Sequence, residues 1–250
     1  MRRNLLLIIE YDGTAYHGSQ VQKNALGICQ VIQDALQKVL GVREDIVACS
    51  RTDSGVHARM FCVNFYTDRD ILCVKMKYAM NFHLPWDIRV SDCREVPHGF
   101  HARYQARGKR YVYQIWNADY ESPFLKNRAL FYRYPIREEL LNRACQDFVG
   151  THDFTSLCSA GSDIEDKVRT ITQCSVSREG NMVLFTVTGD GFLQNMVRIM
   201  VGTLLRISEG KLAPHAIPQV LAKRDRAAAG ITAPACGLYL DYVFYDWDFR

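Results

Sequence analysis

The sequence lacks several features that mark particular classes of protein. Its 250 residues contain no apolar run near the roughly 18 residues needed to span a membrane. Its nine cysteines are odd in number and include no Cys-x-x-Cys pair, so we predict reduced thiols rather than a zinc site or disulfide framework. Gly13, Gly18 and Gly55 match neither standard phosphate-binding loop, which predicts no nucleotide cofactor. The apolar run from Leu5 to Ile9 is too short for a signal peptide. The expected reduced thiols favour a cytoplasmic protein.

Metal chemistry has equally little support in the sequence. His98 and His101 are three residues apart, but no further cluster of ligand-type residues lies near them, so we predict no metal site.

Positive charge is modest overall but unevenly distributed. The formal net charge is +4, yet four basic residues gather within eight positions, with tyrosines between and after them. Such interleaving suits a polyanion whose bases can be stacked upon, and it equally suits the solvated face of a strand. The segment comprises Arg103, Tyr104, Arg107, Lys109, Arg110, Tyr111 and Tyr113.

Hydrophobic periodicity predicts an α+β protein. In the first part, helical spacing covers 28–40 and about 70–82, and strand patterns cover 5–11, 46–49, 60–66 and 88–90. This β-α-β-β-α-β order is that of a ferredoxin-like unit. In the second part, strands are predicted at 109–116, 129–134, 168–176, 182–188 and 238–244, helices at 136–149, 192–208 and 219–223, and a polar loop at 151–163.

We therefore expect two ferredoxin-like halves with mostly antiparallel sheets and a cleft between them. The predicted domains are residues 1–103 and 104–250.

The stretch from Cys49 to Arg59 concentrates polar chemistry between two apolar segments. It holds one carboxylate, two arginines, an imidazole and a glycine. Asp53 and the following residues have turn chemistry, because Gly55 tolerates a positive φ. Asp53 would lie on a loop between two strands, where catalytic residues often occur, although an ordinary structural loop fits the same pattern.

Two other residues have settings that suggest function. Arg198 lies on the flank of an apolar helical stripe, where an arginine either extends its charged group to solvent or meets a buried anion such as Asp53. Tyr111 shares a strand face with Tyr113; both can be core residues, and Tyr111 can also stack on a base at the floor of a cleft.

Five motifs in the same order resemble the tRNA pseudouridine synthase A family over nearly the whole chain. The central one, Arg51 to Ala58, resembles that family's R-T-D-x-G-V-H-A active-site motif. The others are Tyr11-Asp12-Gly13 with the loop Tyr16 to Gln20, Phe100 to Arg103 with Arg110-Tyr111-x-Tyr113, Phe192-Leu193 with Met196-Val197-Arg198, and Ala233-Pro234 with Gly237-Leu238.

Three positions depart from the family pattern. Ser19 stands where the family often has tryptophan, Ser54 replaces a common alanine, and Cys236 is inserted before Gly237. These departures fall in loops expected near the RNA, so they bear on the choice of substrate more than on the chemistry.

The resemblance implies an isomerase that converts uridine to pseudouridine in the anticodon arm of tRNA, at positions 38–40, as a homodimer without metal or organic cofactor. It assigns the essential carboxylate to Asp53, its partner to Arg198 and the ring that stacks on uracil to Tyr111. It assigns base flipping and RNA binding to Arg51, Arg103, Lys109 and Arg110, and support of the site to Gly55, His57 and Leu238.

Two rival functions are weighed against this one. A non-catalytic RNA-binding or RNA-chaperone protein would not need Asp53, Tyr111 and Arg198 together. An aspartate-based nucleoside hydrolase would have no use for the basic and aromatic segment.

Overall fold

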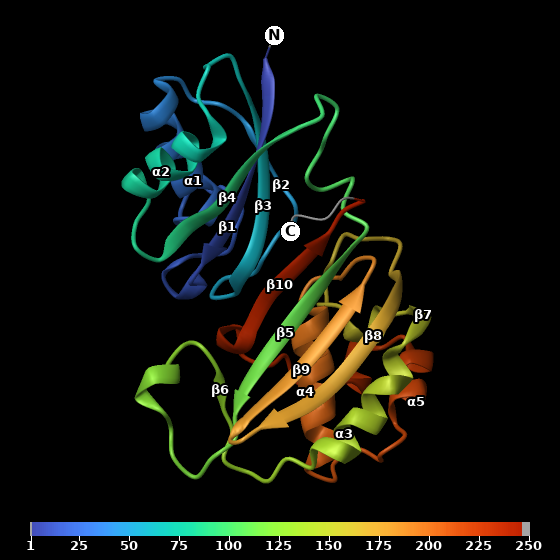
Figure 1. Ribbon diagram of the computed structural model, residues 1–250. Helices are drawn as coiled ribbons and strands as arrows, with labels where there is room; N and C mark the ends of the chain where they lie inside the picture. Colours follow the sequence, from blue (N-terminus) through green and yellow to red (C-terminus); the bar gives the residue numbers. More distant parts are fainter. Residues whose placement is uncertain (1, 247–250) are drawn as a thin grey trace. The chain divides into compact units, whose positions relative to one another are not determined.

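The computed structural model describes residues 2–246, and the chain divides into two compact units, which Figure 1 draws coloured along the sequence. Unit 1 contains the residues up to 107 together with those from 239 onward, and unit 2 contains residues 108–238. The final strand, which the sequence placed with the second half, belongs to unit 1 from Tyr239 onward, and its residues Tyr239 and Leu240 pair in parallel with His57 and Ala58.

Unit 1 has the predicted β-α-β-β-α-β order. Its elements are β1 (Arg3–Tyr11), α1 (Ile28–Leu40), β2 (Ile46–Ala48), β3 (His57–Thr67), α2 (Cys73–His83), β4 (Ile88–Val96) and, after unit 2, β10 (Leu238–Phe244). The strands β4, β1 and β3 are antiparallel neighbours, and β2 pairs antiparallel with β3. The α+β class with mostly antiparallel pairing is confirmed.

The sequence explains why α1 forms and ends where it does. Its apolar residues recur at helical spacing, so that Ile28, Ile32 and Leu36 are all fully buried. Gly41 follows with φ 77°, a left-handed conformation that glycine adopts without strain and that terminates the helix.

Strand β1 forms the centre of the core of unit 1. Leu5, Leu6 and Leu7 are each 0% exposed, so side chains on both faces of the strand are buried. The continuous apolar run that predicted a buried strand is therefore explained by cover on two sides. Helices α1 and α2 lie over one of these faces (Figure 1).

The strands of unit 2 pair mostly in antiparallel fashion. Strand β9 lies between β5 and β8, β8 also pairs with β7, and β6 pairs in parallel with β5. Its elements are β5 (Gly108–Trp116), β6 (Leu130–Phe131), α3 (Glu138–Ala144), β7 (Gly150–Asp153), β8 (Val168–Glu179), β9 (Met182–Gly189), α4 (Met196–Ser208) and α5 (Ile217–Lys223).

Three predictions in unit 2 were wrong in their details. The helix predicted over 136–149 is α3 followed by a 3-10 turn at Cys145–Phe148. The predicted polar loop at 151–163 begins within the short edge strand β7. Helix α4 starts at Met196 rather than 192, because Asn195 has φ 59° and interrupts the helical conformation.

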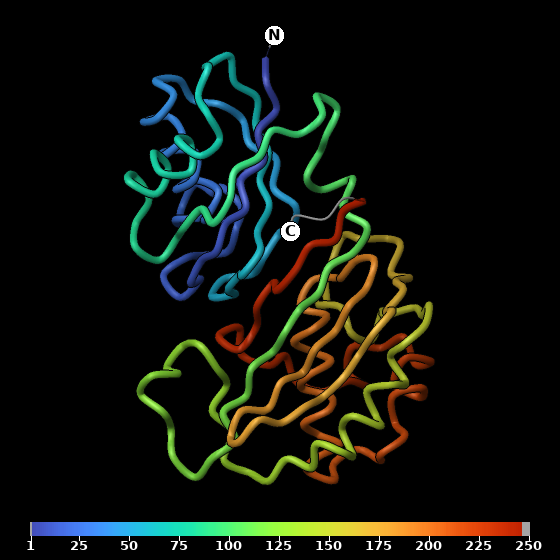
Figure 2. Tube along the Cα trace, in the orientation of Figure 1, coloured from blue at the N-terminus to red at the C-terminus, as the bar shows by residue number. Residues whose placement is uncertain are grey.

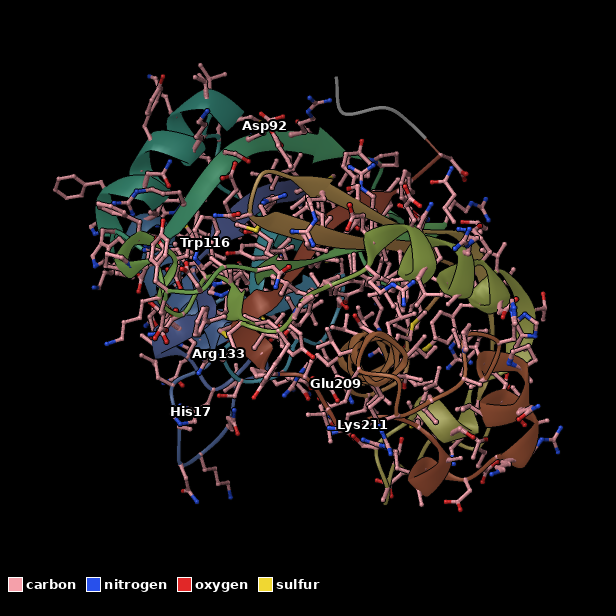
Figure 3. All side chains as sticks on the ribbon, turned by 90° about the horizontal axis from the view of Figure 1, so that it is seen from below. His17, Asp92, Trp116, Arg133, Glu209 and Lys211 are labelled. Carbon is pink, nitrogen blue, oxygen red and sulfur yellow. The ribbon has the colours of Figure 1, made fainter. Side chains whose placement is uncertain are left out.

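The C-terminal end of α4 is fixed by polar contacts. Glu209 lies 2.8 Å from the Lys211 ammonium group, and both side chains are labelled in Figure 3. The Tyr132 hydroxyl donates a hydrogen bond of 2.6 Å to the same carboxylate. This end of the helix is thereby joined to the segment that follows β6.

Candidate active site

Asp53 lies in a tight turn between β2 and β3. The Val56 N–H donates to the Asp53 carbonyl at 3.2 Å, and Gly55 has φ 77°. The Asp53 side chain is half-buried, whereas Thr52 before it is buried and Arg51 is exposed. The turn thus holds the backbone around Asp53 in place while part of its side chain remains accessible.

A second loop packs its backbone directly against this turn. A Cβ atom added at Gly13 would lie 2.0 Å from the Val56 carbonyl oxygen, and one at Gly18 would lie 2.5 Å from that of Thr52. No side chain fits at either contact. The glycines of the opening motif are therefore explained by close backbone approach to the Asp53 turn.

Hydrogen bonds join the same two loops. Ser19 donates its N–H to the Thr52 carbonyl at 3.1 Å, and its hydroxyl accepts the Thr52 N–H at 2.8 Å. The hydroxyl groups of Tyr11 and Thr52 share a buried hydrogen bond of 2.8 Å. The Gly55 N–H donates to the Tyr16 carbonyl at 3.2 Å. Ser19, one of the departures from the family pattern, is thus part of the contact that holds the turn.

His57, at the start of β3, lies beneath the loop contact. It is 1% exposed, and its Nδ1 accepts the Gly13 N–H at 3.1 Å and lies 3.2 Å from Asp12 Oδ1. The imidazole stacks on the Tyr239 ring with centroids 4.6 Å apart. We call the contact between the loop of residues 13–19 and the Asp53 turn the brace. His57 is thereby connected both to the brace and to β10.

Arg59, two residues after His57 on β3, contacts the ring of the same tyrosine. Its guanidinium carbon is 4.9 Å from the centre of the Tyr239 ring, within the range of a cation–π interaction. Its Nη1 is 3.0 Å from Asp241 Oδ1. Sequence reasoning did not identify Tyr239 or Asp241, because their contacts with the motif span about 180 residues.

In unit 2, Tyr111 and Tyr113 share a buried strand but have different surroundings. Tyr111 is 6% exposed, and its ring meets Phe192 edge-to-face with centroids 5.0 Å apart. Tyr113 is fully buried, and its hydroxyl donates to the Pro234 carbonyl at 2.7 Å. Burial raises the pKa of Tyr113 well above its ordinary value, so this phenol stays protonated.

The Arg198 side chain forms hydrogen bonds within unit 2. Its Nε donates to the Ala233 carbonyl at 2.7 Å and its Nη1 to Asn195 Oδ1 at 2.6 Å. Ala233 in turn donates its N–H to the Arg198 carbonyl at 3.1 Å. The guanidinium is therefore held in a fixed position, which contrasts with an arginine that extends freely into solvent.

The remaining predicted residues divide between the two units. Arg103 is exposed in unit 1, where Asp53, Gly55 and His57 lie together. In unit 2, Lys109 and Arg110 are half-buried on β5, paired with Gly189 and Thr188 of β9. Leu238 is 6% exposed and begins β10.

Within residues 2–246, no three side chains of His, Cys, Asp or Glu are grouped so that they could hold a metal ion. Over the same range, every helix is too short or too polar to cross a membrane.

Comparison with known proteins gives one consistent result. A family model described as tRNA pseudouridine synthase matches residues 7–105 and 144–246. Over 243 residues the chain is 47% identical to tRNA pseudouridine synthase A of Acetivibrio thermocellus. It is 45% identical over 244 residues to the protein of the same name from Ruminiclostridium cellulolyticum, and 40% identical over 243 residues to that of a Thermoanaerobacter species. Each alignment covers 97% of this chain and 100% of the relative.

Proposed function

Since this chain belongs to the tRNA pseudouridine synthase family, an isomerase family that forms pseudouridine in tRNA, we propose that it modifies uridines of the anticodon arm, at positions 38–40, with Asp53 as its essential carboxylate. The observation that supports this role for Asp53 is the loop contact described above. Two glycines, Ser19 and Tyr16 hold the backbone of the turn, so the carboxylate is presented from a fixed position.

A carboxylate suits the chemistry of this isomerisation. The reaction breaks the C–N glycosidic bond, turns the uracil and rejoins it to the sugar through carbon. Asp53 can serve as a nucleophile or as a base, and it leaves again at the end of the cycle.

Arg198 and Tyr111 are proposed to complete the site during catalysis. An arginine paired with Asp53 would keep the acid ionised, because a nearby positive charge favours the carboxylate form. Arg198 suits this role because Ala233 and Asn195 already hold its guanidinium in position. The Tyr111 ring, supported by Phe192, is proposed to stack on the uracil and to help remove the proton from its C5.

The basic residues are proposed to handle the RNA itself. The reacting uridine must leave the base stack, and the exposed Arg51 is proposed to occupy the space that it vacates. Arg103, Lys109 and Arg110 are proposed to bind phosphates, which positions the RNA without reading its sequence. Gly55, His57 and Leu238 are proposed to support the site. The family resemblance is also our basis for proposing a cytoplasmic homodimer that uses neither metal nor organic cofactor.

Mapping of pseudouridine along a tRNA transcript tests the choice of substrate position. After incubation with the wild-type protein, we expect pseudouridine at positions 38–40 and not in the other arms. The Asp53→Ala variant should bind the transcript and leave all its uridines unchanged. Modification confined to another arm would contradict the anticodon-arm proposal, and tRNA binding without any modification by the wild type would favour a non-catalytic RNA-binding protein.

A further inference from the structure

The segment that follows β4, residues 97–107, carries an aromatic pair, His101 and Tyr104, to which the proposed function assigns no role. Figure 2 shows the chain leaving β4 and making a wide turn there. We refer to residues 97–107 as the basic turn. It contains two arginines and two histidines, and no aspartate or glutamate occurs between Pro97 and Arg110.

Buried amide groups hold the basic turn against the sheet of unit 1. Asn4 and Asn64 are each 1% exposed and are joined by a hydrogen bond of 3.0 Å. Asn4 Nδ2 donates to the Phe100 carbonyl at 2.9 Å, and the Ala102 N–H donates to Asn64 Oδ1 at 2.8 Å. Burial of two amide side chains is unfavourable unless they are hydrogen-bonded, so this network fixes the start of the turn.

The exposed ring of Tyr104 is ordered by His101. Their ring centroids are 4.2 Å apart with an interplanar angle of 26°. His101 Nδ1 accepts the N–H groups of both Arg103 and Tyr104 at 3.2 Å, which fixes the imidazole on the turn. Tyr104 is nevertheless 78% exposed. The turn therefore presents an aromatic ring to solvent in a defined orientation.

The charge of the basic turn is complementary to a polyanion. Arg107 forms an ion pair with Asp246 at 2.6 Å, whereas Arg103 is exposed next to Tyr104. An ordered aromatic ring beside an arginine suits single-stranded nucleic acid, because every base has a face that can stack and every nucleotide of the backbone carries a phosphate.

We propose that the Tyr104 ring, supported by His101, is a stacking platform for an unpaired base of the tRNA other than the reacting uridine, next to the phosphate that Arg103 is already proposed to bind. This inference rests on the proposed function in one respect, namely that it takes tRNA as the ligand. Because the stacked base is not the reacting uridine, the platform contributes to affinity for tRNA and not to the chemical step.

Equilibrium binding of a tRNA transcript tests the platform. Tyr104→Ala should raise the Kd by roughly five- to a hundredfold, the range measured for the loss of one base stack, and Tyr104→Phe should bind like the wild type. Tyr78→Ala is the matched control, because Tyr78 is a 67% exposed tyrosine on α2 of the same unit and should leave the Kd unchanged. Thermal unfolding of each variant shows whether unit 1 remains folded.

The salt dependence of binding separates stacking from charge. Arg103→Ala should reduce the slope of log affinity against log salt by about 1, whereas Tyr104→Ala should leave the slope unchanged. A fully paired RNA duplex should bind the wild type and Tyr104→Ala equally, because it offers no unpaired base.

Three results would each contradict the platform proposal. The first is an unchanged tRNA Kd for Tyr104→Ala, and the second is a loss of tRNA affinity in Tyr104→Phe as large as that in Tyr104→Ala. The third is a loss of affinity in Tyr104→Ala that is as large for the RNA duplex as for tRNA. Pseudouridine formation by the wild-type protein is measured alongside. If it persists while Tyr104→Ala binds tRNA normally, the platform is wrong and the proposed function stands; if the wild type forms none, the proposed function itself fails.

Discussion

Arg198 and Asp53 differ in how far their surroundings follow from the sequence. The motif around Asp53 is local, so its turn and its glycine were predictable from eleven consecutive residues. The Thr52 contacts with Ser19 and Tyr11 were not, because the partners lie 33 and 41 residues away and are ordinary residue types. Arg198 was recognised as unusual from its helical position, but its anchors at Ala233 and Asn195 depend on loop conformations with no signal in the sequence.

Replacement of Arg198 tests whether its fixed guanidinium matters for catalysis. Arg198→Leu removes both hydrogen bonds and the positive charge, so we expect kcat for pseudouridine formation to fall by at least about a hundredfold. Arg198→Lys keeps the charge but not the forked geometry of the guanidinium. Its kcat should lie between those of the wild type and Arg198→Leu. Tritium release from C5-labelled uridine in tRNA provides the measurement. Near-normal release by Arg198→Leu would show that the guanidinium has no catalytic part.

At the scale of elements, the β-α-β-β-α-β order of unit 1 was predictable because its helices and strands have clear periodicity. The sequence predicted strand β10 but not its pairing with β3, because the pairing of His57 with Tyr239 joins distant parts of the chain. The short strand β7 was missed because a glycine and three polar residues at the edge of a sheet carry little hydrophobic pattern.

Gly13→Ala tests the brace between the opening loop and the Asp53 turn. The added methyl group would overlap the Val56 carbonyl, so one loop must shift. We expect a loss of about 1–3 kcal/mol in the free energy of unfolding and a larger proportional loss of kcat than of tRNA affinity. Gly99→Ala is the control for stability and kcat, because a Cβ there has no neighbour within 4 Å. The tRNA affinity of Gly13→Ala is compared with that of the wild type, since Gly99 lies in the basic turn. Equal kcat for the two alanine variants would show that the brace does not position Asp53.

At the scale of the whole molecule, carboxylates in both units make stability depend on pH in the same direction. Hydrogen bonds from Lys211 and Tyr132 lower the pKa of Glu209, and the hydrogen bond from Arg3 lowers that of Glu95. A carboxyl whose pKa is lowered in the folded state stabilises the fold above its ordinary value, near 4, and this contribution is lost as pH falls through the folded value. The free energy of unfolding should therefore decline below about pH 4.

Glu209→Gln isolates one of these contributions. At pH 7 the variant should be less stable than the wild type by under about 1 kcal/mol, because the site lies near the surface. The difference should shrink toward zero as the pH is lowered from about 4 to about 2. Denaturant unfolding at several pH values provides the measurement, with the exposed Glu165→Gln as control. A difference that is constant with pH would mean that the hydrogen bonds, and not the charge, are responsible.

Tritium release by Asp53→Asn is the most direct test of the account as a whole. The amide matches the carboxylate in size and leaves the braced turn intact, but it cannot act as a nucleophile or base at neutral pH. We predict that the wild-type protein releases tritium from C5-labelled uridine in tRNA, and that Asp53→Asn binds the same tRNA with unchanged Kd and releases none. Release by Asp53→Asn at a rate close to that of the wild type would contradict the assignment of Asp53 as the essential carboxylate.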